Sequence, residues 1–203
     1  MDVTLAVLSL LGTAVFAASG ALVAAEKGFD LVGAVFLSVA AGLGGGTIAD
    51  LLAGGGVRWL AAPEPLWAAL VSAVVVFEAV RFGAPPAKTL VWADAAGLAL
   101  FTATGMQRFA GQNLDPATTI FLVAIAASGG GIVRDVLANR VPLVFVGEIY
   151  VTAAVLGALA HYGVKLTMLG DGWALSAALA VTFLVRAAGI RFAIGLLPGR
   201  LSR

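Results

Sequence analysis

Two motifs place ionisable side chains beside runs of glycine in strongly apolar parts of the chain. Asp50 follows the triplet Gly44–Gly46 by one helical turn, and Asp135 follows the triplet Gly129–Gly131 at the same distance. Arg134 stands directly before Asp135. Charged groups in apolar surroundings are costly unless they are paired or hydrated, so these three side chains are candidates for an ion path. A structural ion pair is the alternative for Arg134 and Asp135.

The glycine triplets predict an interruption in the helices that carry them. Glycine costs about 1 kcal/mol relative to alanine in a helix interior, so three in a row favour a break or kink. A break leaves peptide groups without intrahelical partners, and within a membrane these must face protein or a water-filled path. Small residues also allow close helix packing without any path. Because the triplets recur in equivalent places, we favour the break. The predicted pore-bend residues are Gly44, Gly45, Gly46, Gly129, Gly130 and Gly131.

Two hydroxyl side chains are weaker candidates. Ser19 and Thr104 occupy matched positions in apolar stretches and could face the breaks. Hydroxyls in membrane helices more often donate to their own backbone, which is the alternative here.

These motifs lie within stretches that are long enough to cross a membrane. Of 203 residues, 61% are hydrophobic and 11% are charged, against roughly 45–50% and about 25% in soluble domains. A helix of about 20 apolar residues spans the hydrocarbon layer. We predict an all-α membrane protein with seven transmembrane helices: Leu5–Ala25, Leu31–Ala53, Leu66–Phe82, Val91–Phe109, Ala117–Ala138, Ile149–Val164 and Trp173–Phe192.

An internal duplication organises the chain. Ala18–Gly20 resembles Ala103–Gly105, and Asp30 corresponds to Asp115. These pairs and the two triplets share one constant offset of 85 in residue number. Each unit holds three spans, so the second copy must enter the membrane inverted. We predict one transmembrane domain over 1–203, with repeat one at about 1–85, repeat two at about 86–170 and a seventh helix at about 173–192.

The distribution of basic residues predicts an orientation. One side of the predicted topology carries Lys27, Arg81, Lys88, Arg140, Arg191, Arg200 and Arg203, and the other carries Arg58, Arg108 and Lys165. By the positive-inside rule the N-terminus lies outside and the C-terminus lies in the cytoplasm of a cell (inner) membrane. The net charge of +1 gives the chain no strongly positive electrostatic field, so the sequence does not predict binding of nucleic acid. We expect no enzyme motif, no metal site and no cofactor.

The second triplet lies in a longer motif that resembles a known family. Gly129–Asp135 reads Gly-Gly-Gly-x-x-Arg-Asp and continues through Val136–Leu143 to Glu148 and Tyr150. This resembles the signature of the trimeric intracellular cation (TRIC) channels and their prokaryotic relatives. The likeness extends over nearly the whole chain. One departure is Ala49, where the pattern leads us to expect an arginine before Asp50.

The resemblance implies a homotrimer with one hourglass pore for monovalent cations in each protomer. It implies that K⁺ or Na⁺ permeates, that the second and fifth helices line the pore, and that Asp50, Arg134 and Asp135 are the associated polar residues. Membrane lipids are expected partners. Relatives have also been described as glycine transporters, so a secondary transporter of a small solute is the alternative. A non-conducting structural membrane protein is the third reading.

Overall fold

The computed structural model describes residues 3–83, 85–86, 88–146, 149–167 and 169–194. Within these residues the chain forms eight α-helices and one short 3₁₀ helix, η1. Their bounds are α1 Val3–Glu26, α2 Leu31–Leu52, α3 Arg58–Ala61, α4 Glu64–Phe82, α5 Thr89–Phe109, α6 Pro116–Leu137, η1 Leu143–Phe145, α7 Val151–Lys165 and α8 Asp171–Phe192. Each of the seven predicted spans therefore coincides closely with a helix.

Two equivalent aspartates begin the helices that carry the glycine triplets. Asp30 accepts a hydrogen bond from the Gly33 amide at 2.8 Å and caps α2. Asp115 caps α6 through the amides of Ala117 and Thr118, and Pro116 occupies the first helical position. A side-chain oxygen at this position satisfies amides that have no partner inside the helix.

The same two helices also end alike. Gly54 and Asn139, at equivalent positions of the two repeats, have φ angles of +70° and +52°. The next amides, of Gly55 and Arg140, donate to the carbonyl oxygens of Asp50 and Asp135 at 3.0 and 2.8 Å. This is the Schellman arrangement, which satisfies the last carbonyl groups of a helix. It fixes where each chain segment leaves the helix, directly beside the two aspartates.

Six of the described helices are long and apolar enough to cross a membrane, namely α1, α2, α4, α5, α6 and α8. The seventh predicted span is α7, which has 15 residues. At 1.5 Å per residue it is about 22 Å long, short of a ~30 Å hydrocarbon layer. Its ends nevertheless reach opposite ends of α5. Tyr150 donates to Asp94 at the start of α5, and Lys165 pairs with Asp171, whose carbonyl accepts from Gln107 at the end of α5.

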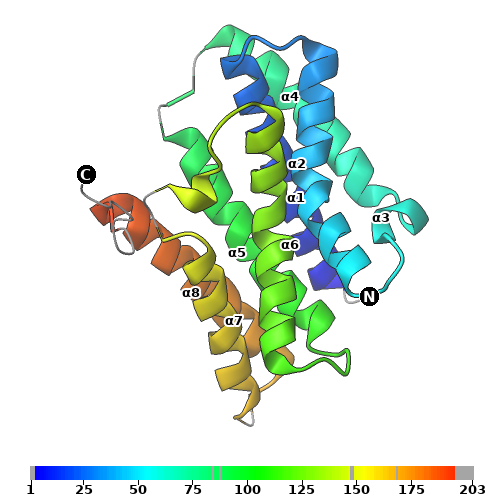
Figure 1. Cartoon of the computed structure of the whole chain (residues 1–203), viewed down its shortest axis with the longest axis vertical. Coiled ribbons are helices and arrows are strands. Elements are labelled where there is room, and N and C mark those ends of the chain that lie inside the picture. Colours follow the sequence, from blue (N-terminus) through cyan, green and yellow to red (C-terminus); the bar gives the residue numbers. More distant parts are fainter. Residues whose placement is uncertain (1–2, 84, 87, 147–148, 168, 195–203) are drawn as a thin grey trace, which may run out of the picture.

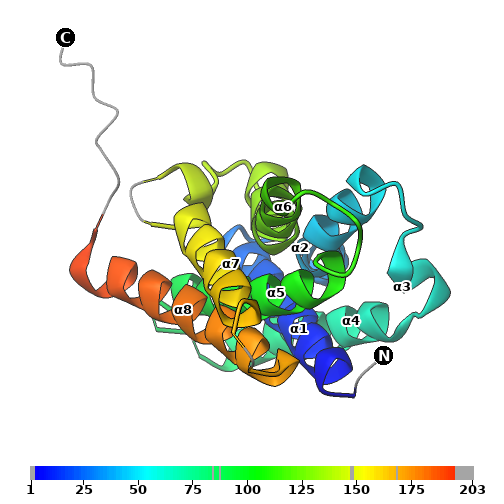
Figure 2. The same cartoon turned by 90° about the horizontal axis from the view of Figure 1, so that it is seen from below.

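The helices form a bundle around α1 and α5. Figure 1 shows α2 and α6 side by side, with α7 and α8 beyond α5. Seen from below in Figure 2, α1 and α5 lie in the middle, between α2 and α6 on one face and α4 and α8 on the flanks. Helices α1 and α5 run in opposite directions, because Asp94 near the start of α5 and Ser19 near the end of α1 contact the same guanidinium group.

The glycine triplets do not interrupt their helices. Helix α2 is continuous through Gly44–Gly46, and α6 is continuous through Gly129–Gly131. The predicted break, with peptide groups freed at mid-helix, is therefore wrong; a bend of the helix axis there stays a prediction. The physical reason is that glycines of both triplets bring the two helix backbones into contact, which offsets their poor helix propensity.

The contact between the triplets is reciprocal. A Cβ on Gly45 would overlap the carbonyl oxygen of Ala126, and a Cβ on Gly130 would overlap the carbonyl oxygen of Ala41. Ala41 and Ala126 are themselves equivalent positions of the two repeats. Phe16 and Phe101, another equivalent pair, stack on each other with ring centroids 5.6 Å apart. In each equivalent pair the two residues are 85 positions apart in the chain, the offset that also separates the repeated sequence motifs.

Alanine substitutions separate glycines that pack from glycines that face open space. Gly130→Ala is expected to lower the free energy of unfolding by about 1–3 kcal/mol, because the new methyl group overpacks the α2–α6 contact. Gly46→Ala is the matched control: an added Cβ meets nothing within 4 Å, so stability stays the same or rises by up to about 1 kcal/mol. Denaturant titration in detergent measures both, and an equal loss in the two variants would contradict the assignment.

Candidate functional site

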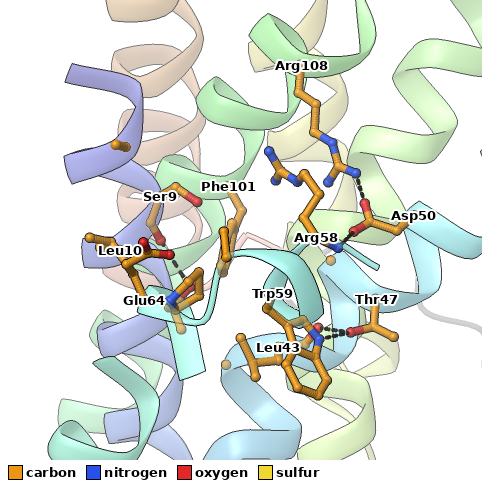
Figure 3. Close-up of a pocket in the computed structure, with 16 residues that line it drawn as sticks. Ser9, Leu10, Leu43, Thr47, Asp50, Arg58, Trp59, Glu64, Phe101 and Arg108 are labelled. Carbon is orange, nitrogen blue, oxygen red and sulfur yellow. Dashed lines mark hydrogen bonds and ion pairs between the residues drawn. The ribbon is translucent and has the colours of Figure 1, made fainter. Parts of the chain in front are cut away.

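A cavity of about 330 Å³ lies beside the first glycine triplet. Residues of α1, α2, α3, α4 and α5 line it. Figure 3 shows Asp50, Arg58 and Arg108 at one end of it, and Glu64 near Ser9 at another. Gly46 forms part of the wall, and the space that a side chain would fill there is open. The third glycine of the triplet therefore widens the cavity, while its neighbours pack.

Asp50 is held from two directions at one end of this cavity. The guanidinium group of Arg108, on α5, forms an ion pair with its Oδ1 atom. The backbone amide of Arg58 donates to its Oδ2 atom at 3.1 Å. The residue before Asp50 is Ala49 and cannot pair with it, so the partner comes from another helix. Only 3% of Asp50 is exposed, so its carboxylate interacts with protein groups and not with bulk solvent.

The short helix α3 covers one side of the cavity. The indole N–H of Trp59 donates to Thr47 Oγ1 at 3.0 Å, and Thr47 donates in turn to the Leu43 carbonyl at 2.8 Å. These two bonds tie α3 to α2 directly beside the triplet. Partial burial lowers the pKa of the Arg58 guanidinium from its usual value, but arginine remains protonated at neutral pH.

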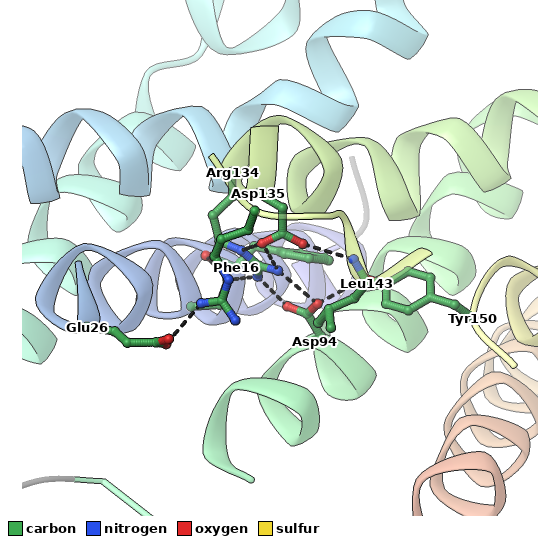
Figure 4. A network of polar contacts seen from close by, with 9 residues as sticks. Phe16, Glu26, Asp94, Arg134, Asp135, Leu143 and Tyr150 are labelled. Atoms are coloured by element: carbon green, nitrogen blue, oxygen red, sulfur yellow. Dashed lines mark hydrogen bonds and ion pairs between the residues drawn. The ribbon is translucent and has the colours of Figure 1, made fainter. Parts of the chain in front are cut away.

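A second polar cluster lies beside the second triplet and is completely buried. Arg134 donates to both oxygens of Asp94, at 2.5 and 3.2 Å, to Asp135 at 2.9 Å, and to Ser19 Oγ at 2.7 Å. Tyr150 adds a hydrogen bond to Asp94 at 3.3 Å. Figure 4 shows Arg134 between the two carboxylates, with Tyr150 on the far side of Asp94. We refer to these five residues as the Arg134 network.

The charges of the network are balanced locally. Arg134 faces two carboxylates, and a second buried arginine, Arg186 of α8, lies over the Tyr150 ring at 4.9 Å. Arg186 also donates to the Ile149 carbonyl at 3.2 Å. Paired and hydrogen-bonded charges of this kind survive in an apolar interior, whereas removing one partner leaves the other uncompensated.

The cavity and the Arg134 network occupy equivalent places in the two halves of the chain. Asp135 accepts from the Leu143 amide at 3.1 Å, and Asp50 accepts from the equivalent Arg58 amide at the same distance, 3.1 Å. Gly131 lies beside Tyr150 and Asp94, whereas the equivalent Gly46 faces open space. The difference lies in the side chains: Asp94 and Arg134 in the second half stand where the first half has Ser9 and Ala49.

Comparison with known proteins identifies the family of the chain. A family model described as "Glycine transporter" matches residues 6–81 and again residues 91–165. The starts of the two matches differ by the same offset as the repeated motifs. The chain belongs to this family. The inner membrane protein YadS of Escherichia coli (strain K12) is 36% identical over 191 residues, 91% of each chain. A membrane protein of Vibrio cholerae is 34% identical over 199 residues, 93% of this chain and 80% of that protein.

Solved structures share the fold over the full chain. The TRIC trimeric intracellular cation channel orthologue from Rhodobacter sphaeroides aligns with a TM-score of 0.90 and 36% identity, covering 95% of this chain and 100% of that chain. A prokaryotic TRIC channel solved in 0.5 M KCl aligns with a TM-score of 0.88 and 32% identity, covering 97% and 100%. The resemblance to the TRIC family predicted from the sequence is confirmed. The chain is a helical membrane protein of this family.

The structure brings some of the predicted site residues together and leaves others apart. Asp50 lines the cavity, and Arg134, Asp135 and Ser19 meet in the network. Thr104 donates to the Leu100 carbonyl of its own helix at 2.9 Å, as hydroxyl side chains in membrane helices commonly do. Glu148, Arg200 and Arg203 lie outside the described residues. Among the described residues no group of three or more His, Cys, Asp or Glu side chains could hold a metal ion.

Sequence reasoning missed Asp94 and the role of Arg108. Asp94 lies in the fourth apolar stretch, near the start of α5, and is fully buried. The sequence did contain a sign of this role. A carboxylate within a membrane span requires a partner, and Arg134 is a buried cation in the same half of the chain. Arg108 was counted only with the basic residues on one side of the predicted topology, and its ion pair with Asp50 was not predicted.

The network predicts a large cost for removing Asp94. Asp94→Asn leaves Arg134 paired only with Asp135 and is expected to lower the free energy of unfolding by about 3–5 kcal/mol. Asp115→Asn is the matched control, because asparagine caps a helix as well as aspartate does, and its effect stays near zero. Both are measured by denaturant titration in detergent. A small effect of Asp94→Asn would show that the buried pair is not needed.

Proposed function

We propose that the chain is a channel for monovalent cations, permeable to K⁺, with one permeation path in each protomer. The observation that carries this proposal is the fold shared with solved TRIC cation channels over 95–100% of the chain, with TM-scores of 0.87–0.90. The cavity beside Gly46 lies inside that shared fold. Charged side chains at one end of the cavity and a glycine in its wall are features that allow a hydrated ion to enter.

We propose seven membrane crossings arranged as two inverted three-helix units, α1–α2–α4 and α5–α6–α7, followed by α8. Contacts between helix ends support alternate directions. Arg140 after α6 pairs with Glu26 at the end of α1, at 2.9 Å. Arg108 at the end of α5 pairs with Asp50 near the end of α2. The side that holds Arg140 and Lys27 is the more basic. By the positive-inside rule we propose an outside N-terminus and a cytoplasmic C-terminus.

The proposed path runs along α2 and α6, from the cavity towards the Arg134 network. Gly46 borders its first part and Gly131 its second. The stacked rings of Phe16 and Phe101 separate the two parts, and the network fills the second. This arrangement is open on the Asp50 side and closed on the Arg134 side. Conduction then requires the network or the ring pair to move, because an ion cannot cross a fully packed core.

The proposed channel assembles as a homotrimer in lipid. The Rhodobacter sphaeroides orthologue is described as trimeric. Many large apolar side chains lie on the outside of the bundle, among them Phe36, Trp67, Phe82, Phe121 and Trp173. Outward apolar surface of this extent suits lipid tails and neighbouring protomers.

Planar bilayer recording of the purified protein tests the channel. Under a tenfold KCl gradient, discrete unitary currents are expected to reverse near the K⁺ equilibrium potential, about 59 mV from zero for a univalent ion. Protein-free bilayers are the control. Reversal towards the Cl⁻ potential would overturn cation selectivity, and an absence of unitary currents would overturn the channel itself.

A secondary transporter of a small solute such as glycine is the second candidate, favoured by the description of the matching family model. Inverted helical repeats suit alternating access as well as conduction. Proteoliposomes loaded with buffer distinguish the two: saturable uptake of labelled glycine, without unitary currents in bilayers, would favour the transporter.

A bulky side chain at Gly46 tests the proposed path. Gly46→Leu is expected to reduce the unitary current at least about threefold, because the leucine side chain fills cavity space along the route. Gly163→Leu is the matched control: Gly163 is exposed on α7, and an added Cβ meets nothing within 4 Å there. Unchanged current in Gly46→Leu would place the path elsewhere.

A further inference from the structure

The Asp50 end of the cavity carries more positive than negative charge. Two guanidinium groups, of Arg58 and Arg108, meet one carboxylate. Both oxygens of Asp50 are already engaged, one by the Arg108 ion pair and the other by the Arg58 backbone amide. Among the described residues the Arg58 side chain forms no ion pair. Figure 3 shows the two guanidinium groups on the same side of Asp50.

The other carboxylate in the lining does not offset this charge. Glu64 begins α4 and lies near Ser9 and Leu10, away from the arginines, in Figure 3. The excess positive charge therefore belongs to the Asp50 end alone. Two adjacent guanidinium groups provide several N–H donors in fixed directions, which is the arrangement that recognises carboxylate or phosphate oxygens.

The remaining wall of the cavity is mainly apolar. Leu10, Leu43, Trp59 and Phe101 contribute most of its bulk. A volume of about 330 Å³ lies at the lower end of the range for small-molecule pockets. This volume fits a ligand with one short alkyl chain and is too small for a lipid with two acyl chains. A bare inorganic anion or glycine would leave the apolar wall uncovered.

We propose that this cavity binds a single-chain organic oxyanion, a carboxylate or a phosphate monoester that carries an apolar chain. Arg58 and Arg108 hold the charged head, and the wall formed by Leu43, Trp59 and Phe101 holds the chain. Such a ligand lies against the first glycine triplet, so it occupies the space that the proposed ion path also uses. Binding itself does not depend on the channel proposal.

Fluorescence of Trp59 tests the site directly. The triple variant Trp67→Phe/Trp92→Phe/Trp173→Phe keeps Trp59 as the single tryptophan and is placed in lipid nanodiscs. Octanoate and octyl phosphate are the probes, and octanol is the uncharged control of equal chain length. We expect a saturable change with at least one anionic probe, at a concentration about tenfold lower than for octanol. The ratio between the two anionic probes identifies the preferred head group.

Arginine variants in the same background locate the charged end. Arg58→Gln is expected to weaken binding of the anionic probe about tenfold and to leave octanol unchanged. Arg81→Gln, at an exposed arginine on α4, is the matched control and keeps full affinity. Arg108→Gln should act as Arg58→Gln does; if it unfolds because Asp50 loses its partner, Arg58→Gln decides alone.

Two results would overturn the proposal. One is equal affinity for octanol and both anionic probes, which would show that chain partitioning alone drives binding. The other is equal affinity in Arg58→Gln and Arg81→Gln. Neither result bears on the unitary currents, so failure here and failure of the channel proposal are distinguishable.

Discussion

The backbone contact between α2 and α6 is the constraint on which the rest of the structure depends. Gly45 and Gly130 each approach a carbonyl group of the opposite helix, at Ala126 and Ala41, with no room for a methyl group. Close packing of two helices in a membrane relies on such small residues, because lipid supplies no hydrophobic drive between helices. The contact sets the distance between α2 and α6. The third glycine of each triplet, Gly46 or Gly131, then lies beside one of the two polar sites.

The two polar sites contain matching aspartates, 85 positions apart in the chain, and side-chain differences explain why the sites are unlike. Equivalent aspartates cap the chain after α2 and after α6 through equivalent amides. In the second half, Arg134 and Asp94 fill the space beside the triplet with a paired network. In the first half, Ala49 and Ser9 leave that space open, and an arginine of α5 pairs with Asp50. The bundle thus carries one site with free space, beside Gly46, and one site that side chains fill, beside Gly131.

Electrostatics in the two sites differ in consequence. The network is locally neutral once Arg186 is counted with Arg134 against the two aspartates, and all of these groups are shielded from solvent. The cavity has one carboxylate against two guanidinium groups at one end. The carboxylate at this end of the cavity is therefore already paired, and it presents no free negative charge to the cavity.

The sequence by itself determined the membrane class and the helix positions, because apolar length and helix caps are local properties of the chain. The two inverted units that the constant offset between motifs predicts stay a prediction. The sequence also identified Asp50, Arg134, Asp135 and the triplets as unusual. Only the tertiary structure decided what the triplets do and which charges pair. Glycine propensity favours a break, but packing between helices distant in sequence outweighs it. The partners Asp94 and Arg108 both come from α5, far along the chain from the groups they bind, and no local pattern specifies such pairs.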